Sequence, residues 1–188
     1  MDVHTQSFLN NHPCFNKGAS VNWGRVHLPV APNCNIQCNF CNRMYDCANE
    51  NRPGVTQKVY TPDEAVAYLE KLFKDRQDIS VIGIAGPGDP MCDADKTLPT
   101  FEKCRARFPH LMLCLSTNGL ALPEHVDDIV RIGVSHVTVT VNAVTPSVGG
   151  KVYAWVRYNG KTYTGEEGAA ILLARQDEGI RKLKEAGM

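Results

Sequence analysis

Short apolar runs alternate with longer segments of helical periodicity along most of the chain. Four runs are rich in Val, Ile and Leu and are bounded by Gly, Pro or Asn, as buried parallel strands are. They cover residues 25–31, 80–85, 111–116 and 136–141. Helical segments follow at residues 61–75, 98–108, 123–133 and 165–186. This alternation predicts right-handed βαβ units, and therefore an α/β fold with a parallel sheet.

Local signals mark where these helices begin and end. Thr61-Pro62-Asp63-Glu64 has the pattern of a capping box with proline at the first helical position. Gly133 stops the third helical segment and Gly187 closes the fourth, as glycine commonly does at the end of a helix.

The fourth predicted strand has one apolar and one polar face. In HVTVTVN, residues 136–142, the three valines share one side, and Thr138, Thr140 and Asn142 share the other. A strand buried on both sides does not normally carry such a polar row. Either this side faces a ligand, or the strand has one side in solvent.

Polar or Gly/Pro-rich segments follow each predicted strand: CNIQCNFC, GPGDP, STNG and NAVTP. In parallel α/β sheets, ligands bind in the loops at the carboxyl ends of the strands. The sequence therefore predicts a binding site at this edge of the sheet.

Charge and composition exclude several classes of protein. Lys+Arg and Asp+Glu number 20 each among the 188 residues, without a long basic run, so we expect no nucleic-acid partner. No segment is apolar enough to span a membrane, and the N-terminus lacks the pattern of a signal peptide. We therefore expect a cytoplasmic protein, in which eight cysteines indicate metal ligation rather than disulfides.

Three of these cysteines, Cys34, Cys38 and Cys41, form a C-x3-C-x2-C motif. Three thiolates can hold three irons of a [4Fe–4S] cluster and leave the fourth iron open, whereas structural zinc sites have closed four-coordinate shells. Cys47 is close enough in sequence to supply a fourth ligand. An electron carrier with a fully ligated cluster is therefore an alternative interpretation.

The motif, with Phe40 directly before its last cysteine, resembles the signature of the radical S-adenosylmethionine (SAM) enzymes. The resemblance implies a full or partial (β/α) barrel, here with about four βα units. It also implies a [4Fe–4S] cluster whose open iron is chelated by SAM. An electron from that cluster then cleaves SAM to a 5′-deoxyadenosyl radical.

The same resemblance implies a set of SAM contacts. GPGDP stands where this family has a Gly-Gly-Glu-type motif, and glycines there allow close approach to a ligand. GPGDP and STNG are also typical of tight turns, and this alternative stays open. The implied SAM-binding residues are Phe40, Gly86, Pro87, Gly88, Asp89, Ser116, Asn118, Thr138 and Asn142.

HPC at residues 12–14, APNCNIQCNFCNRMYDCANENRPGV at 31–55, GIAGPGDP at 83–90 and LCLSTNGLALPE at 113–124 closely resemble the NifB family. This resemblance implies a role in nitrogen fixation, as a radical SAM enzyme of nitrogenase FeMo-cofactor biosynthesis. Such an enzyme fuses two [4Fe–4S] clusters into an eight-iron core that contains a SAM-derived carbide. The implied partners are the iron–sulfur cluster substrates, together with cluster-delivery, electron-donor and downstream nitrogenase-assembly proteins.

The NifB resemblance also implies ligands for the substrate clusters. The candidates are His12, Cys14, Cys47, Glu50 and Cys114. Which of the first two ligates iron stays open, and Glu50 could equally be a solvated loop residue. Cys114 has the strand parity of Ser116, so both are expected on one face about 7 Å apart; the alternative is a buried structural thiol.

The remaining cysteines and histidines are predicted to be structural, and two further polar residues are weaker candidates for the site. Cys104 lies at helical spacing from Phe101 and Phe108, which predicts core packing. Cys92, His27 and His136 are interpreted as structural. Asn142 and Arg157 are candidates to line a substrate cavity, and Arg157 could equally be an exposed arginine.

Two other functions of the chain are consistent with these motifs. One is a radical SAM enzyme that acts on a small organic substrate, and the other is a non-catalytic iron–sulfur carrier.

The expected domain organisation is an irregular segment at residues 1–24, which holds candidate cluster ligands, and a radical SAM core at 25–188. The NifB family continues beyond the fourth helix with further strands and a C-terminal C-x-x-C pair. We therefore expect the C-terminal part of the barrel to be missing from this sequence, either because it is a fragment or because it is a short relative.

Overall fold

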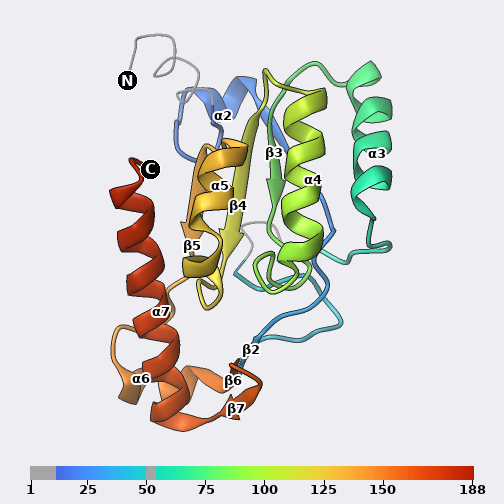
Figure 1. Cartoon of the computed structure of the whole chain (residues 1–188). Coiled ribbons are helices and arrows are strands. Elements are labelled where there is room, and N and C mark those ends of the chain that lie inside the picture. The colour runs from blue at the N-terminus through green and yellow to red at the C-terminus, as the bar shows by residue number, and fades with distance from the viewer. Residues whose placement is uncertain (1–11, 50–53) are drawn as a thin grey trace.

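In the computed structural model, which describes residues 12–49 and 54–188, four parallel strands form the main sheet (Figure 1). Their order is β1 (Gly24–His27), β3 (Ile79–Ile84), β4 (Met112–Thr117), β5 (His136–Val139). All four predicted strands are present. β1 ends at His27 rather than at residue 31, because Pro29 has no N–H to continue the ladder.

Three helices cover one face of this sheet: α3 (Pro62–Asp75), α4 (Ala94–Arg107) and α5 (Val126–Ile132) (Figure 1). The capping box predicted for α3 is present, with Glu64 N donating to Thr61 Oγ1 at 3.3 Å and Thr61 N donating to Glu64 Oε2 at 2.9 Å. Gly133 ends α5 in the left-handed conformation, with φ of 79°.

Helix α4 begins at Ala94, earlier than predicted, and continues through Pro99. Its inner side packs into the main core between the helices and the sheet, where Phe101 and Cys104 are both 0% exposed. The prediction that Cys104 is a packing residue is confirmed. Burial of such apolar side chains is the main favourable term in folding of this layer.

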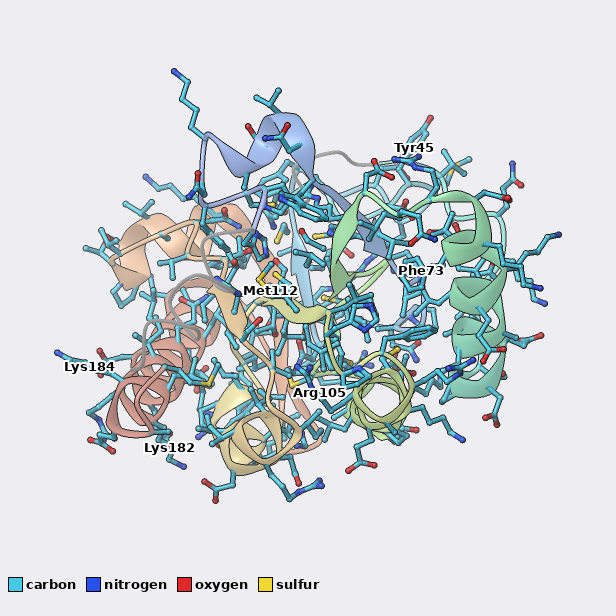
Figure 2. The ribbon with its side chains drawn as sticks, turned by 90° about the horizontal axis from the view of Figure 1, so that it is seen from above. Tyr45, Phe73, Arg105, Met112, Lys182 and Lys184 are labelled. Atoms are coloured by element: carbon cyan, nitrogen blue, oxygen red, sulfur yellow. The ribbon has the colours of Figure 1, made fainter. Side chains whose placement is uncertain are left out.

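Hydrogen bonds from Arg105 link α4 to the end of α5 and to the segment before β4. Its guanidinium donates hydrogen bonds to four backbone carbonyls, those of Pro109, Leu111, Ile132 and Gly133. Seen from above, Arg105 lies between the two helices, whereas Lys182 and Lys184 point outward from the last helix (Figure 2).

A second, antiparallel sheet was not predicted. It contains β2 (Ile36–Cys38), β6 (Tyr153–Tyr158) and β7 (Lys161–Tyr163), and lies with α6 (Pro146–Val152) at the foot of the molecule (Figure 1). Asn159 and Gly160, both with positive φ, form the β6–β7 turn, as in tight hairpins. Helix α7 (Gly165–Glu185) then runs from this sheet back along α5. A single helical turn, α2 (Ala19–Asn22), precedes β1.

The two faces of β5 differ as predicted. Val137 and Val139 pack against the main core, while Thr138 is exposed on the opposite side. Val141 lies beyond the end of the strand and is 42% exposed, so its predicted place on the apolar face was wrong. Within the described ranges, no helix is long and apolar enough to cross a membrane.

Candidate functional site

Cys34, Cys38 and Cys41 lie together at the carboxyl edge of the main sheet. They line one pocket, here called the thiol pocket, with a volume of about 510 Å³ that includes space open to solvent. Cys38 ends β2, and Cys41 N donates to Cys38 O at 3.0 Å, which closes a tight turn between the two thiols. Because β2 pairs with β6, the small sheet fixes the backbone of the motif.

Burial and neighbouring negative charge keep thiols of this pocket protonated. Burial, followed by the charges of Cys34 and Cys41, raises the pKa of Cys38 to about 12. Burial and the carboxylate of Asp89 also raise the pKa of Cys34. Without a cation these thiols are protonated at neutral pH, so a metal that binds them as thiolates has to displace protons.

Three thiols around one pocket are compatible with a [4Fe–4S] cluster. Across residues 12–49 and 54–188, no three His, Cys, Asp or Glu side chains converge as ligands of one metal ion. In a [4Fe–4S] cubane each thiolate binds a different iron, so three sulfurs around a pocket need not meet at one point.

Cys47 lines the thiol pocket beside the three motif cysteines. Burial raises the pKa of its thiol as well. This position keeps open whether Cys47 binds a substrate cluster or completes the first one.

Five of the predicted SAM contacts, Phe40, Gly88, Asp89, Ser116 and Asn118, line the thiol pocket. Thr140, at the end of β5, lines it too. Gly86 and Pro87 line a neighbouring cavity with His27, Asp46 and Thr56 instead. Thr138 borders a further pocket described below, and Asn142 lies past β5, where its N–H donates to Tyr153 Oη at 3.3 Å.

The Asp89 carboxylate is occupied by protein donors. It is 3% exposed and accepts hydrogen bonds from Thr117 Oγ1 and from the N–H groups of Met91, Cys92 and Asn118. Burial raises the pKa of Asp89, and these donors oppose that rise. Asp89 therefore joins the GPGDP loop to the end of β4.

Gly88 makes a close approach, but to the protein's own chain. A Cβ at this position would lie 2.0 Å from the carbonyl oxygen of Asn33. Gly88 N donates to Ala31 O at 2.7 Å and Asp89 N donates to Asn33 O at 2.6 Å. Gly88 therefore makes room for the start of the cysteine loop, and because it also lines the thiol pocket, its role as a SAM contact stays a prediction.

Asn118 connects the end of β4 to the cysteine loop, because its Nδ2 lies 2.7 Å from Asn35 Oδ1 and 3.6 Å from the Cys34 sulfur. The backbone of Asn118 is held in turn by Gln176 of α7, whose Nε2 donates to Asn118 O at 2.7 Å and to Thr140 O at 3.0 Å. The sequence interpretation missed Gln176. A polar residue on the same helical stripe as Leu172 and Leu183 was the available signal.

A second pocket, here called the His12 pocket, adjoins the thiol pocket and has a volume of about 560 Å³, which also includes space open to solvent. It brings together candidates far apart in sequence, and its polar or sulfur-bearing lining includes His12, Cys14, Arg25, His27, Cys114 and Thr138. Cys114 and Ser116 both line it, in keeping with their shared strand parity.

His12 is 0% exposed and packs against His136 and Phe15, with ring centroids 4.4 and 4.6 Å away. Its Nδ1 accepts a hydrogen bond of 3.1 Å from Cys14 N. Burial, then the nearby His136 and Arg25, lowers the pKa of His12 to about 4. Arg25 in turn donates to the Cys14 sulfur.

His27, which the sequence interpretation treated as structural, also lines the His12 pocket. Its ring lies across β3 at Gly83, where a Cβ would come within 2.7 Å of His27 Cδ2. The two residues are partners in the β1–β3 register, so a glycine opposite a histidine was the signal for this placement.

Other candidates lie elsewhere. Arg157 is exposed on β6, with its guanidinium 5.2 Å from the Trp155 ring centroid, so it does not line the described pockets. Cys92 lies next to the Asp89 carboxylate, and burial raises the pKa of its thiol to about 12. Glu50 falls outside the described residues.

The thiol pocket and the His12 pocket are contiguous. Both are lined by Asn49, Ala85 and Ser116. The two pockets are therefore neighbours on the same edge of the sheet.

Comparison with known proteins identifies relatives of this chain. The chain is 48% identical over 180 residues to the "FeMo cofactor biosynthesis protein NifB" of Chlorobaculum tepidum, covering 96% of this chain and 42% of the relative. It is 48% identical over 188 residues to NifB of Sinorhizobium fredii and 49% identical over 177 residues to NifB of Frankia alni, covering 38% and 35% of these relatives.

The chain thus spans about two fifths of the length of the curated relatives it matches. The sequence pattern of the radical SAM superfamily, whose members use a [4Fe–4S] cluster and SAM, matches residues 28–188. This match covers most of the chain and includes the three motif cysteines and strands β3, β4 and β5 of the main sheet. The chain belongs to the radical SAM superfamily.

Proposed function

We propose that this chain is the radical SAM part of an enzyme of nitrogenase FeMo-cofactor biosynthesis. Two observations support the proposal: the near-50% identity to NifB proteins and the contiguity of the two pockets. The contiguity is the observation that carries it, because radical chemistry on a bound cluster requires the SAM site and the substrate site to adjoin.

In this proposal, Cys34, Cys38 and Cys41 hold the SAM-cleaving [4Fe–4S] cluster. When bound, that cluster would supply the electron that cleaves SAM. Phe40, Ser116 and Asn118 lie where they could contact SAM, and Asp89 positions the loops around it. Gly86, Pro87, Thr138 and Asn142 stay candidate contacts at its margins.

The His12 pocket would receive a substrate cluster. Cys14 and Cys114 supply sulfur ligands, and His27 supplies an imidazole in the same pocket. The full reaction would fuse two [4Fe–4S] substrates into an eight-iron core. One SAM would donate a methyl group, and the 5′-deoxyadenosyl radical from a second SAM would abstract hydrogen from that group. Cluster-delivery, electron-donor and nitrogenase-assembly proteins in the cytoplasm would serve this reaction.

One specific observation favours a second function. Cys47 lines the same pocket as the motif cysteines, so it could complete a four-thiolate cluster. The chain would then be an iron–sulfur carrier without an iron open to SAM.

Anaerobic reconstitution with iron and sulfide distinguishes these functions. The proposed enzyme is expected to bind well above the four irons of one cubane and to cleave SAM. About four irons with SAM cleavage would indicate a radical SAM enzyme acting on an organic substrate. About four irons without cleavage would indicate a carrier and overturn the proposal.

A further inference from the structure

His12 uses only one of its two ring nitrogens. Nδ1 accepts a hydrogen bond from Cys14 N, whereas Nε2 is buried and has no hydrogen-bond partner among the residues that the structure describes. A buried polar atom left without a partner costs about 1–3 kcal/mol, so such atoms usually have a role.

The bond to Cys14 fixes the tautomer of the ring. A nitrogen that accepts a hydrogen bond carries no proton, so the single proton of the neutral imidazole is on Nε2. A protonated Nε2 cannot bind iron. To become a ligand, His12 would have to move its proton to Nδ1 and give up the bond to Cys14 N.

We infer that His12 is a buried hydrogen-bond donor to the sulfur of a cluster ligated by Cys14, and not itself an iron ligand. This inference rests on the proposed function, in which the His12 pocket holds a substrate cluster. His12 is then a positioning residue: Nδ1 holds the backbone of Cys14, and the Nε2–H stabilises the bound sulfur.

The surroundings of His12 favour a sulfur-rich anion as its acceptor. Nε2 is buried and has no acceptor among the described residues, and His12 lines the His12 pocket, so a group bound there could serve as its acceptor. No described Asp or Glu lines the His12 pocket, whereas Arg25 lines it and donates to the Cys14 sulfur. A thiolate-ligated iron–sulfur cluster is an anion whose sulfurs accept such hydrogen bonds.

Hydrogen bonds to the sulfurs of a cluster stabilise its more negative, reduced form and so raise its reduction potential. Two substitutions separate this effect from packing and from ligation. Gln places an N–H group near the position of Nε2, so His12→Gln preserves a donor. His12→Asn preserves a partner for Cys14 N but has no group that reaches as far as Nε2.

The experiment uses the full chain with Cys34, Cys38 and Cys41 all replaced by Ala, so that iron reports on the His12 pocket alone. After anaerobic reconstitution, iron content and midpoint potential are measured for this background and for His12→Gln, His12→Asn and Cys14→Ala within it. His110→Gln, at an exposed histidine outside both pockets, is the matched control.

We expect His12→Asn to keep its iron and shift the midpoint potential downward. His12→Gln and His110→Gln are expected to keep both iron and potential, and Cys14→Ala to lose most of the iron. Loss of iron in both His12 variants would show that His12 is an iron ligand. An unchanged midpoint potential in His12→Asn would show that His12 only packs against its neighbours. Either result overturns the inference while the cluster site stands. A background that takes up no iron overturns the proposed function together with the inference.

Discussion

At the scale of single residues, Asp89 is the carboxylate on which two loops of the site depend. Its oxygens accept from Thr117, Asn118, Met91 and Cys92. Replacing Asp89 by Asn keeps the shape but places an NH₂ group against N–H and O–H donors. We expect a loss of about 2–4 kcal/mol in the free energy of unfolding, measured by denaturant titration.

The control for this prediction is Asp177→Asn, which removes the same charge at an exposed position of α7. Its free energy of unfolding is expected to change by less than about 0.5 kcal/mol. Equal stabilities for the two variants would show that the Asp89 carboxylate is not needed to hold the loops.

The ionisation of Cys104 predicts how the free energy of unfolding changes at high pH. Burial raises its pKa from 9.0 to about 12, so the folded chain keeps this thiol neutral while the unfolded chain ionises it above pH 9. The unfolded state then binds fewer protons, and the free energy of unfolding falls as pH rises from 9 towards 12. Denaturant titrations at pH 8 and 10 are expected to show a smaller fall in Cys104→Ala than in the unsubstituted chain; equal falls would refute the assignment.

At the scale of elements, the close contact between the GPGDP loop and the cysteine loop depends on Gly88. An added Cβ would lie 2.0 Å from the backbone oxygen of Asn33, and backbone cannot give way as a flexible side chain can. We expect Gly88→Ala to separate the loops and to reduce iron uptake at the motif cysteines severalfold, as measured by iron analysis after reconstitution.

Gly24→Ala is the matched control, because its Cβ would meet its neighbours at an ordinary 3.6 Å. It is expected to reconstitute like the unsubstituted chain. Normal iron content in Gly88→Ala would mean that the cysteine loop does not depend on this contact.

The main sheet and its helices were predictable because their signals are local. Apolar runs, the capping box at Thr61 and the glycine after α5 act over a few residues. The small sheet was not predictable in the same way, because β2 has three residues and lies inside the cysteine motif. It becomes a strand only by pairing with β6, more than a hundred residues away. The Asn159-Gly160 turn was the local clue to the β6–β7 hairpin.

At the scale of the whole molecule, motif spacing predicted which cysteines gather, but not how the site divides into two pockets. Sequence placed Cys114 with Ser116 by strand parity, and both line the His12 pocket. The position of His27 over Gly83 depends on the register of two strands that are far apart in sequence. The helical stripe marked Gln176 as a buried polar residue, but its two backbone partners depend on long-range packing.

The two-pocket arrangement predicts opposite phenotypes for two cysteines. Cys38→Ala removes a thiolate from the SAM-cleaving cluster and is expected to abolish SAM cleavage. Cys114→Ala is expected to spare uncoupled SAM cleavage but to lower the iron bound beyond the first cluster. Product analysis by chromatography, with iron determination on the same samples, checks both. Loss of SAM cleavage in Cys114→Ala, or retention in Cys38→Ala, would contradict the division.

The most direct test of the central claim is electron paramagnetic resonance of the reduced, reconstituted chain with and without SAM. If three thiolates hold the cluster and one iron is open, SAM is expected to change the spectrum, and Cys47→Ala is expected to show the same change. A spectrum that SAM leaves unaltered until Cys47 is removed would show a fourth thiolate on that iron, and would contradict the account.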